Sequence, residues 1–191
     1  MACEAAEVAL SRSGIDGEDL AAVFSASVSD PFAEHGVAAH VAYRFGATGD
    51  VRTDDFRGTP RAATDALLAA DEFVSVRGGA ALVVGVDVIP TEAGADGEAE
   101  AGAGAGAAVL GPDAERPAAR VASSGSGTTG FVERHRRHGE PPVTGDEKFE
   151  RTRGVPDAAG RAIEARFREL FTDGKRPIDS FKFAVPRGER E

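Results

Sequence analysis

Short apolar runs alternate along this chain with segments that carry apolar residues at helical spacing. The pattern predicts helices over 2–13, 31–45, 60–75 and 156–174, and strands over 21–29, 51–56, 80–89, 102–111, 119–126 and 178–186. The strand signal is clearest in "AALVVGVDVI" (80–89), whose continuous β-branched run is typical of a strand buried on both faces. Strands that alternate with helices indicate an α/β fold with helices layered on a mixed sheet.

The glycine run "GAGAGAAVLG" (102–111) allows two interpretations. Gly102, Gly104 and Ala107 loosely match a dinucleotide-binding fingerprint, but that motif needs a helix directly after the glycines. The residues that follow are apolar and end in a turn. We therefore predict a strand so closely packed that only small side chains fit there.

Charge narrows the classes of protein that the chain could represent. The 191 residues include 32 acidic and 22 basic residues, which gives a formal net charge of −10. This acid-rich, lysine-poor composition is typical of cytosolic proteins from salt-loving organisms, in which salt screens the repulsion. The negative charge argues against nucleic-acid binding, and neither a signal peptide nor a membrane span is evident. We expect a soluble cytoplasmic protein.

Few residues combine into a reactive or metal-binding pattern. His135 and His138 form an H-x-x-H pair that could ligate zinc, but no third ligand stands at suitable spacing, so a solvated basic loop is the better interpretation. Cys3 is the single cysteine, which excludes an internal disulfide and fits a reducing compartment. We therefore predict no metal and no resident cofactor.

Six segments, in order, are similar to successive parts of the thiolase superfamily, and among its members to hydroxymethylglutaryl-CoA synthases of archaeal type. They are "AVFSASVSDPFA", "DDFRGTPRAATDALLAA", "ALVVGVDV", "GAGAGAAVLG", "RHGEPPVTGDEKFER" and "FKFAVP". The resemblance implies a layered α/β/α/β/α fold of two similar halves with mixed sheets, incomplete at both termini. Residues 1–118 would form the first half without its first strand. Residues 119–191 would begin the second half and include the loop 127–155.

In this family a cysteine at a helix N-terminus accepts the acyl group, a glutamate acts as acid and base, and a histidine assists. The nucleophile helix begins there with Cys, a basic residue, Ala, Gly and Thr, and "PRAAT" of this chain puts Pro60 in the place of the cysteine. The matching positions for the glutamate and the histidine region hold Val28 and Arg187. The resemblance thus implies that no catalytic position is intact.

Two functions from different classes follow from the resemblance. In the first, the chain is a degenerate, non-catalytic homologue of these acyl-CoA C-acyltransferases and serves as a binding or assembly subunit. In the alternative, it is a condensing-enzyme subunit that handles acyl-CoA, with loop 127–155 shaping a pantetheine tunnel and a partner supplying the catalytic groups. A CoA thioester is the ligand that the family suggests. A missing first strand would leave a neighbouring strand unpaired, so we expect a homo-oligomer, or a hetero-complex with a thiolase or an OB-fold zinc-ribbon protein.

Overall fold

The computed structural model describes residues 1–30, 32, 34–88, 93–94, 98–112, 117–121, 124, 134–135, 143–144, 152–153 and 160. The chain divides into two compact units, Met1–Arg120 and Val121–Glu191. The predicted strand 178–186 lies outside the described residues, and so does the predicted helix 156–174 apart from the helical Gly160.

The first unit is built on one mixed sheet. Its helices are α1 (Ala2–Ser13), α2 (Val37–Arg44) and α3 (Ala62–Arg77), with short 3-10 turns at η1 (Gly17–Asp19) and η2 (Glu98–Glu100). Its strands are β1 (Leu20–Ser27), β2 (Arg52–Arg57), β3 (Ala80–Val88) and β4 (Ala103–Leu110), in the order β2-β1-β3-β4. Strand β1 runs parallel to β2 and β3, whereas β4 pairs antiparallel with β3. The predicted α/β class is confirmed.

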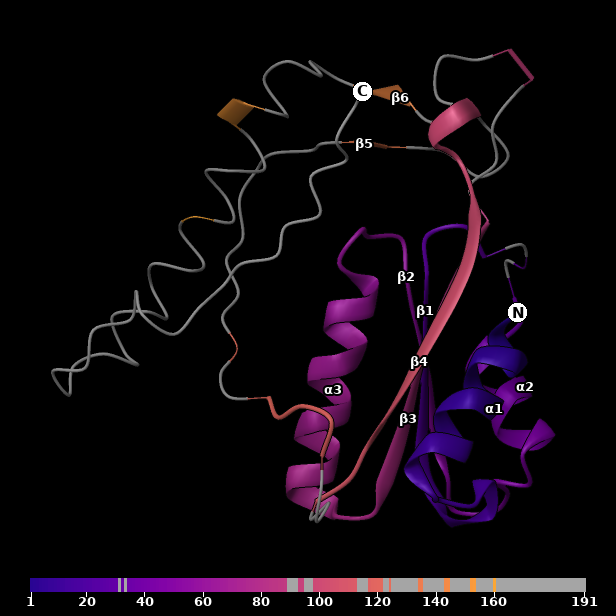
Figure 1. Cartoon of the computed structure of the whole chain (residues 1–191), viewed down its shortest axis with the longest axis vertical. Coiled ribbons are helices and arrows are strands. Elements are labelled where there is room, and N and C mark those ends of the chain that lie inside the picture. The colour runs from indigo at the N-terminus through magenta and orange to yellow at the C-terminus, as the bar shows by residue number, and fades with distance from the viewer. Residues whose placement is uncertain are drawn as a thin grey trace, which may run out of the picture. The chain divides into compact units, whose positions relative to one another are not determined.

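Helices cover both faces of this sheet. Helix α3 lies on one side and helices α1 and α2 on the other (Figure 1). Because successive strand residues point to opposite faces, β1 sends Val23 toward α1 and α2 and Phe24 toward α3. The fully buried Phe24 ring meets the rings of Phe56 and Phe73 edge-on, with centroids 6.1 and 6.2 Å away. These aromatic contacts fix α3 to the sheet.

The helix boundaries follow capping residues more closely than apolar spacing. Helix α1 ends, as predicted, at Gly14, which takes φ 69°. Helix α2 begins at Val37 rather than at residue 31, because Gly36 is its N-cap and Asp55 of β2 accepts the Ala38 N–H at 3.0 Å. Helix α3 begins at residue 62 rather than 60 and ends at a left-handed glycine after Arg77.

The unpaired backbone of the sheet lies at its two edge strands. Strand β1 pairs with β2 on one side and with β3 on the other, through partners such as Phe24 with Val83. No strand of the four described is left unpaired in the interior of the sheet. The open backbone edges in this unit belong to β2 and β4, and the expectation of a missing first strand stays a prediction.

The two later strands are less enclosed than predicted. Residues Ala80–Val84 of β3 are buried, but exposure increases toward Val88, because β1 pairs with β3 only as far as Gly85. Strand β4 is largely exposed, and a Cβ added at Gly104 or Gly106 would meet no atom within 4 Å. The prediction that close packing selects the small residues of β4 is therefore wrong, since this strand lies at the edge of the sheet.

The described residues of the second unit include one short antiparallel pair. Strand β5 (Arg134–His135) pairs with β6 (Val143–Thr144), so part of the predicted loop 127–155 forms a ladder. The predicted strand 119–126 is not found at its described positions 119–121 and 124, and Val121 is half-exposed. Among the described residues of both units, no helix is long and apolar enough to cross a membrane.

Candidate functional site at the carboxyl edge of the sheet

The carboxyl ends of β1, β2 and β3 meet at one edge of the sheet, because the three strands are parallel. The chain leaves β1 toward β2 on one side and leaves β3 toward β4 on the other. In α/β sheets the crevice at such a change of direction is where ligands bind. Val28 directly follows β1, and Pro60 lies between β2 and α3, so the structure brings these two predicted positions to the same edge. Arg187 lies outside the described residues.

One carboxylate bridges the ends of β1 and β3. Asp87 Oδ1 accepts the backbone N–H groups of Val28 at 2.8 Å and Ser29 at 3.0 Å. The same oxygen accepts the hydroxyls of Ser27 at 2.9 Å and Ser29 at 2.8 Å. Four donors on one oxygen hold the segment after β1 firmly against β3. We call Ser27, Val28, Ser29 and Asp87 the Asp87 cluster.

The hydroxyls of the Asp87 cluster are engaged in both directions. Ser27 Oγ also accepts the Ser29 N–H at 3.1 Å, and Ser29 Oγ accepts the Val88 N–H at 2.8 Å. Each serine therefore donates its proton to the carboxylate and accepts a backbone hydrogen. An arrangement in which both hydroxyls are satisfied internally is suited to holding backbone in place.

Of this cluster, Val28 was identified from the sequence and Asp87 was not. The available signal was a carboxylate inside the β-branched run 80–89, since a charge within a buried strand needs dedicated hydrogen-bond partners. Its partners lie 58–60 residues earlier in the chain, and the pairing of β1 with β3 was needed to locate them.

Pro60 stands in a tight turn before α3. The Thr59 carbonyl accepts the Ala62 N–H at 3.0 Å, and Thr59 Oγ1 accepts the Arg61 N–H at 3.3 Å. Arg61 is the N-cap residue and makes no side-chain cap, and its guanidinium lies 3.6 Å from the Asp65 carboxylate. The helix N-terminus thus offers its dipole and backbone donors, but Pro60 adds neither an N–H nor a nucleophilic atom.

An arginine organises the segment that connects this edge to α2. Arg57, the last residue of β2, donates to the carbonyls of Phe32 at 3.0 Å and His35 at 2.5 Å. Its Nε lies 3.1 Å from Oδ2 of the Asp30 side chain and forms an ion pair with it. The angles of this contact are not those of a hydrogen bond. Asp30 Oδ1 in turn accepts the Phe32 N–H at 2.8 Å. These contacts explain why the predicted helix 31–45 begins only after residue 36.

Metal ligation finds no support in the part of the chain that the structure describes. It contains no group of three His, Cys, Asp or Glu side chains that could hold an ion. His135 lies on β5, and its predicted companion His138 is outside the described residues.

Comparison with known proteins gives sequence relatives of one kind. The chain is 37% identical over 138 residues to a hydroxymethylglutaryl-CoA synthase of Thermococcus gammatolerans, a match that covers 72% of the chain and 39% of the relative. It is 33% identical over 142 residues to the Methanosarcina barkeri enzyme of the same name, covering 74% of the chain and 41% of the relative. The chain thus spans about two fifths of the length of these relatives. No family model matches it.

Solved structures agree on the fold. The structure of MvaS in complex with 3-hydroxy-3-methylglutaryl coenzyme A matches with a TM-score of 0.80 at 22% identity, over 94% of this chain and 44% of that one. PksG, an HMG-CoA synthase from Bacillus subtilis, matches with a TM-score of 0.79 at 16% identity over the same shares. The chain shares part of the fold of these thiolase-like enzymes. Its sequence is similar to the archaeal hydroxymethylglutaryl-CoA synthases, as the six segments predicted.

Proposed function

We propose that this chain is a degenerate hydroxymethylglutaryl-CoA synthase-like protein that acts without catalysis, as a binding or assembly subunit. The observation that carries the proposal is Pro60 in the turn before α3, where the resemblance places the cysteine nucleophile. An acyl-enzyme needs a thiol, hydroxyl or comparable group at this point, and the pyrrolidine ring supplies none.

The position that matches the glutamate of the family supports the same proposal. Val28 stands where the resemblance places the acid/base glutamate, and an isopropyl group transfers no proton. The nearby carboxylate of Asp87 accepts four hydrogen bonds at one oxygen. That oxygen is committed to structure, so we do not assign it the role of the missing glutamate.

The open edges of the sheet favour association. Strands β2 and β4 each have one side without a strand partner among the described residues, and exposed edges are covered in many proteins by another chain. We propose a homo-oligomer or a hetero-complex with a thiolase or an OB-fold zinc-ribbon protein. Light scattering over a concentration series in KCl tests this, and a monomer at every concentration, alone and with each candidate protein, would contradict it.

Intact-mass spectrometry after incubation with acetyl-CoA tests the absence of catalysis. We expect no stable acetyl adduct on the Cys3→Ser variant, which removes the one thiol of the chain. Pro60→Cys in that background restores a thiol at the helix N-terminus, and we expect it to gain at most the adduct, without condensation, because position 28 lacks a carboxylate. An adduct on Cys3→Ser with Pro60 intact would instead favour the alternative, a subunit that still handles acyl-CoA.

A further inference from the structure

A hollow of about 240 Å³ lies beside α3, at the opposite ends of β2 and α3 from the carboxyl edge of the sheet. Arg52, the first residue of β2, and Arg77, the last residue of α3, both line it. Pro60 precedes the other end of the same helix. The hollow is therefore distinct from the candidate site described above, and the proposed function assigns it no role. Its volume lies below the roughly 300–1,000 Å³ of pockets for drug-sized ligands, which restricts it to a small ligand.

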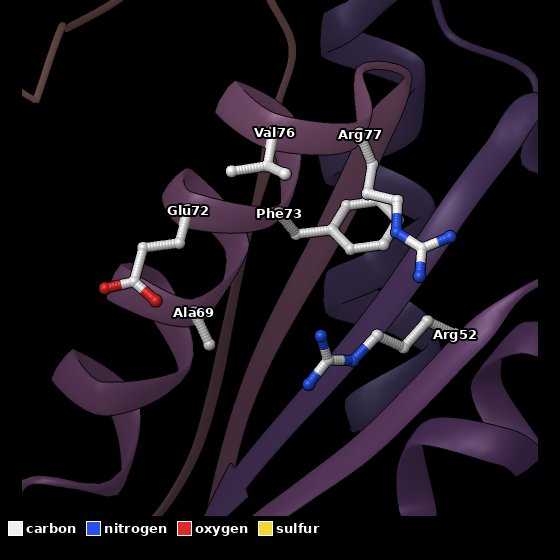
Figure 2. Close-up of a pocket in the computed structure, with 6 residues that line it drawn as sticks. All are labelled: Arg52, Ala69, Glu72, Phe73, Val76 and Arg77. Carbon is white, nitrogen blue, oxygen red and sulfur yellow. The ribbon is translucent and has the colours of Figure 1, made fainter.

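One wall of the hollow is apolar and held in place. Ala69, Phe73 and Val76 contribute it from successive turns of α3 (Figure 2). The Phe73 ring is fixed by its edge-on contact with the buried Phe24, 6.2 Å between centroids. Val76 is 84% exposed, so its side chain is open to a ligand in the hollow. A flat apolar group could cover both side chains.

The other wall is cationic. Arg52 is held by Asp54, whose Oδ2 accepts the Nε–H at 2.8 Å and forms an ion pair with Nη2 at 2.8 Å. The Phe24 ring lies 5.5 Å from the Arg52 Cζ. The remaining Nη1 donors of Arg52 have no recorded acceptor among the described residues. Arg77 has no ion pair within the described part of the chain. Figure 2 shows the Arg77 side chain beside the Phe73 ring and the Arg52 side chain running below that ring, whereas the Glu72 carboxylate points away from Arg77.

Two guanidinium groups beside a fixed ring select a particular class of ligand. Guanidinium donors match the two oxygens of a carboxylate, and the ring offers a face or edge for an apolar body. Asp54 already neutralises part of the charge of Arg52, and the chain as a whole carries −10, which favours a monoanion over a multiply charged phosphate. We propose that the hollow binds a small organic monocarboxylate with a flat apolar body, its carboxylate on Arg77 and Arg52.

Benzoate is the probe for this proposal, and benzyl alcohol, with a similar ring and no charge, is the matched ligand control. In a ¹H–¹⁵N and methyl NMR titration at constant ionic strength, we expect saturable shifts confined to Val76, Arg77 and their neighbours around the hollow. Benzyl alcohol should give at least fivefold weaker binding there, since it cannot engage the guanidinium groups.

Arg77→Gln removes one cation from an exposed helix end and breaks no ion pair of the described residues. We expect it to weaken benzoate binding at least fivefold. Arg44→Gln makes the same change in the last turn of α2 and should leave the affinity unchanged. Val76→Glu places a carboxylate in the hollow and should abolish binding. No saturable shift at the hollow, equal binding by Arg77→Gln, or equal binding of benzyl alcohol would overturn the proposal.

Discussion

Partly buried carboxylates join separate segments of the first unit. Asp55 connects β1, β2 and α2, because its Oδ1 accepts the Ser25 hydroxyl and the Ala38 N–H, the latter at 3.0 Å. Its other oxygen lies where a Cβ on Gly36 would come within 2.7 Å. A side chain from a neighbouring strand thus caps α2, whose own N-cap residue is a glycine without a capping side chain.

Replacing Asp55 by alanine should therefore destabilise the protein more than a comparable change nearby. Asp55→Ala leaves the Ala38 N–H and the buried Ser25 hydroxyl without their acceptor, and we expect a loss of about 1–3 kcal/mol in the free energy of unfolding. Asp54→Ala, on the same strand, breaks only an exposed ion pair with Arg52 and should cost less than about 1 kcal/mol. Urea unfolding in constant salt measures both. Equal losses would show that Asp55 does not act as a cap.

Glycines occur in two different environments among the elements of the sheet. Gly79, in the connection from α3 to β3, has φ +80°, and a Cβ there would stand 2.8 Å from the Cβ of Ala21. Gly104 on β4 has an ordinary strand conformation and open space around it. Glycine is therefore required at position 79 and is not required at position 104.

We expect alanine at these two positions to change stability in opposite directions. Gly104→Ala should raise the free energy of unfolding by roughly 0.4–1 kcal/mol, because it restricts the unfolded chain at no steric cost. Gly79→Ala should lower it by more than about 1 kcal/mol through backbone strain and the clash with Ala21. Urea unfolding of both variants against the parent protein decides the matter. A destabilised Gly104→Ala would mean that β4 is packed more closely than its exposure indicates.

Local sequence patterns predicted where the helices and strands of the first unit lie better than they predicted how buried each strand is. Helix α1 and strand β3 follow from apolar spacing and bounding glycines, and both were found close to their predicted bounds. The sequence could not predict whether β4 is buried or exposed, because small residues fit a closely packed interior and an open sheet edge equally well. The order of the strands could not be predicted either, because β1 and β3 are neighbours in the sheet but are separated along the chain by β2 and α3. Of the candidate site, Val28 and Pro60 were placed by resemblance, whereas Asp87 emerged only once the ends of β1 and β3 were known to be adjacent.

At the scale of the whole molecule, net charge should govern stability. A formal charge of −10 concentrates repulsion in the folded state, and raising KCl from 0.1 to 1 M shortens the Debye length from about 10 to about 3 Å. We expect the melting temperature to rise over that range. Sucrose at matched osmolality is the control, because it favours compact states without screening charge. A melting temperature that is flat or falls with KCl would contradict the interpretation of the acid-rich composition as an adaptation to salt.

The Asp87 cluster also bears on the order in which the first unit folds. Strands β3 and β4 pair antiparallel as consecutive strands, but the contacts of Asp87 join residues 58–60 positions apart. Closing so long a segment costs entropy before any hydrogen bond forms, so contacts of this range develop after local ones. Formation of the cluster then belongs to the last stage of folding, and its loss would mainly accelerate unfolding rather than slow folding. The contacts at the carboxyl edge of the sheet should therefore affect how slowly the first unit unfolds more than how fast it folds.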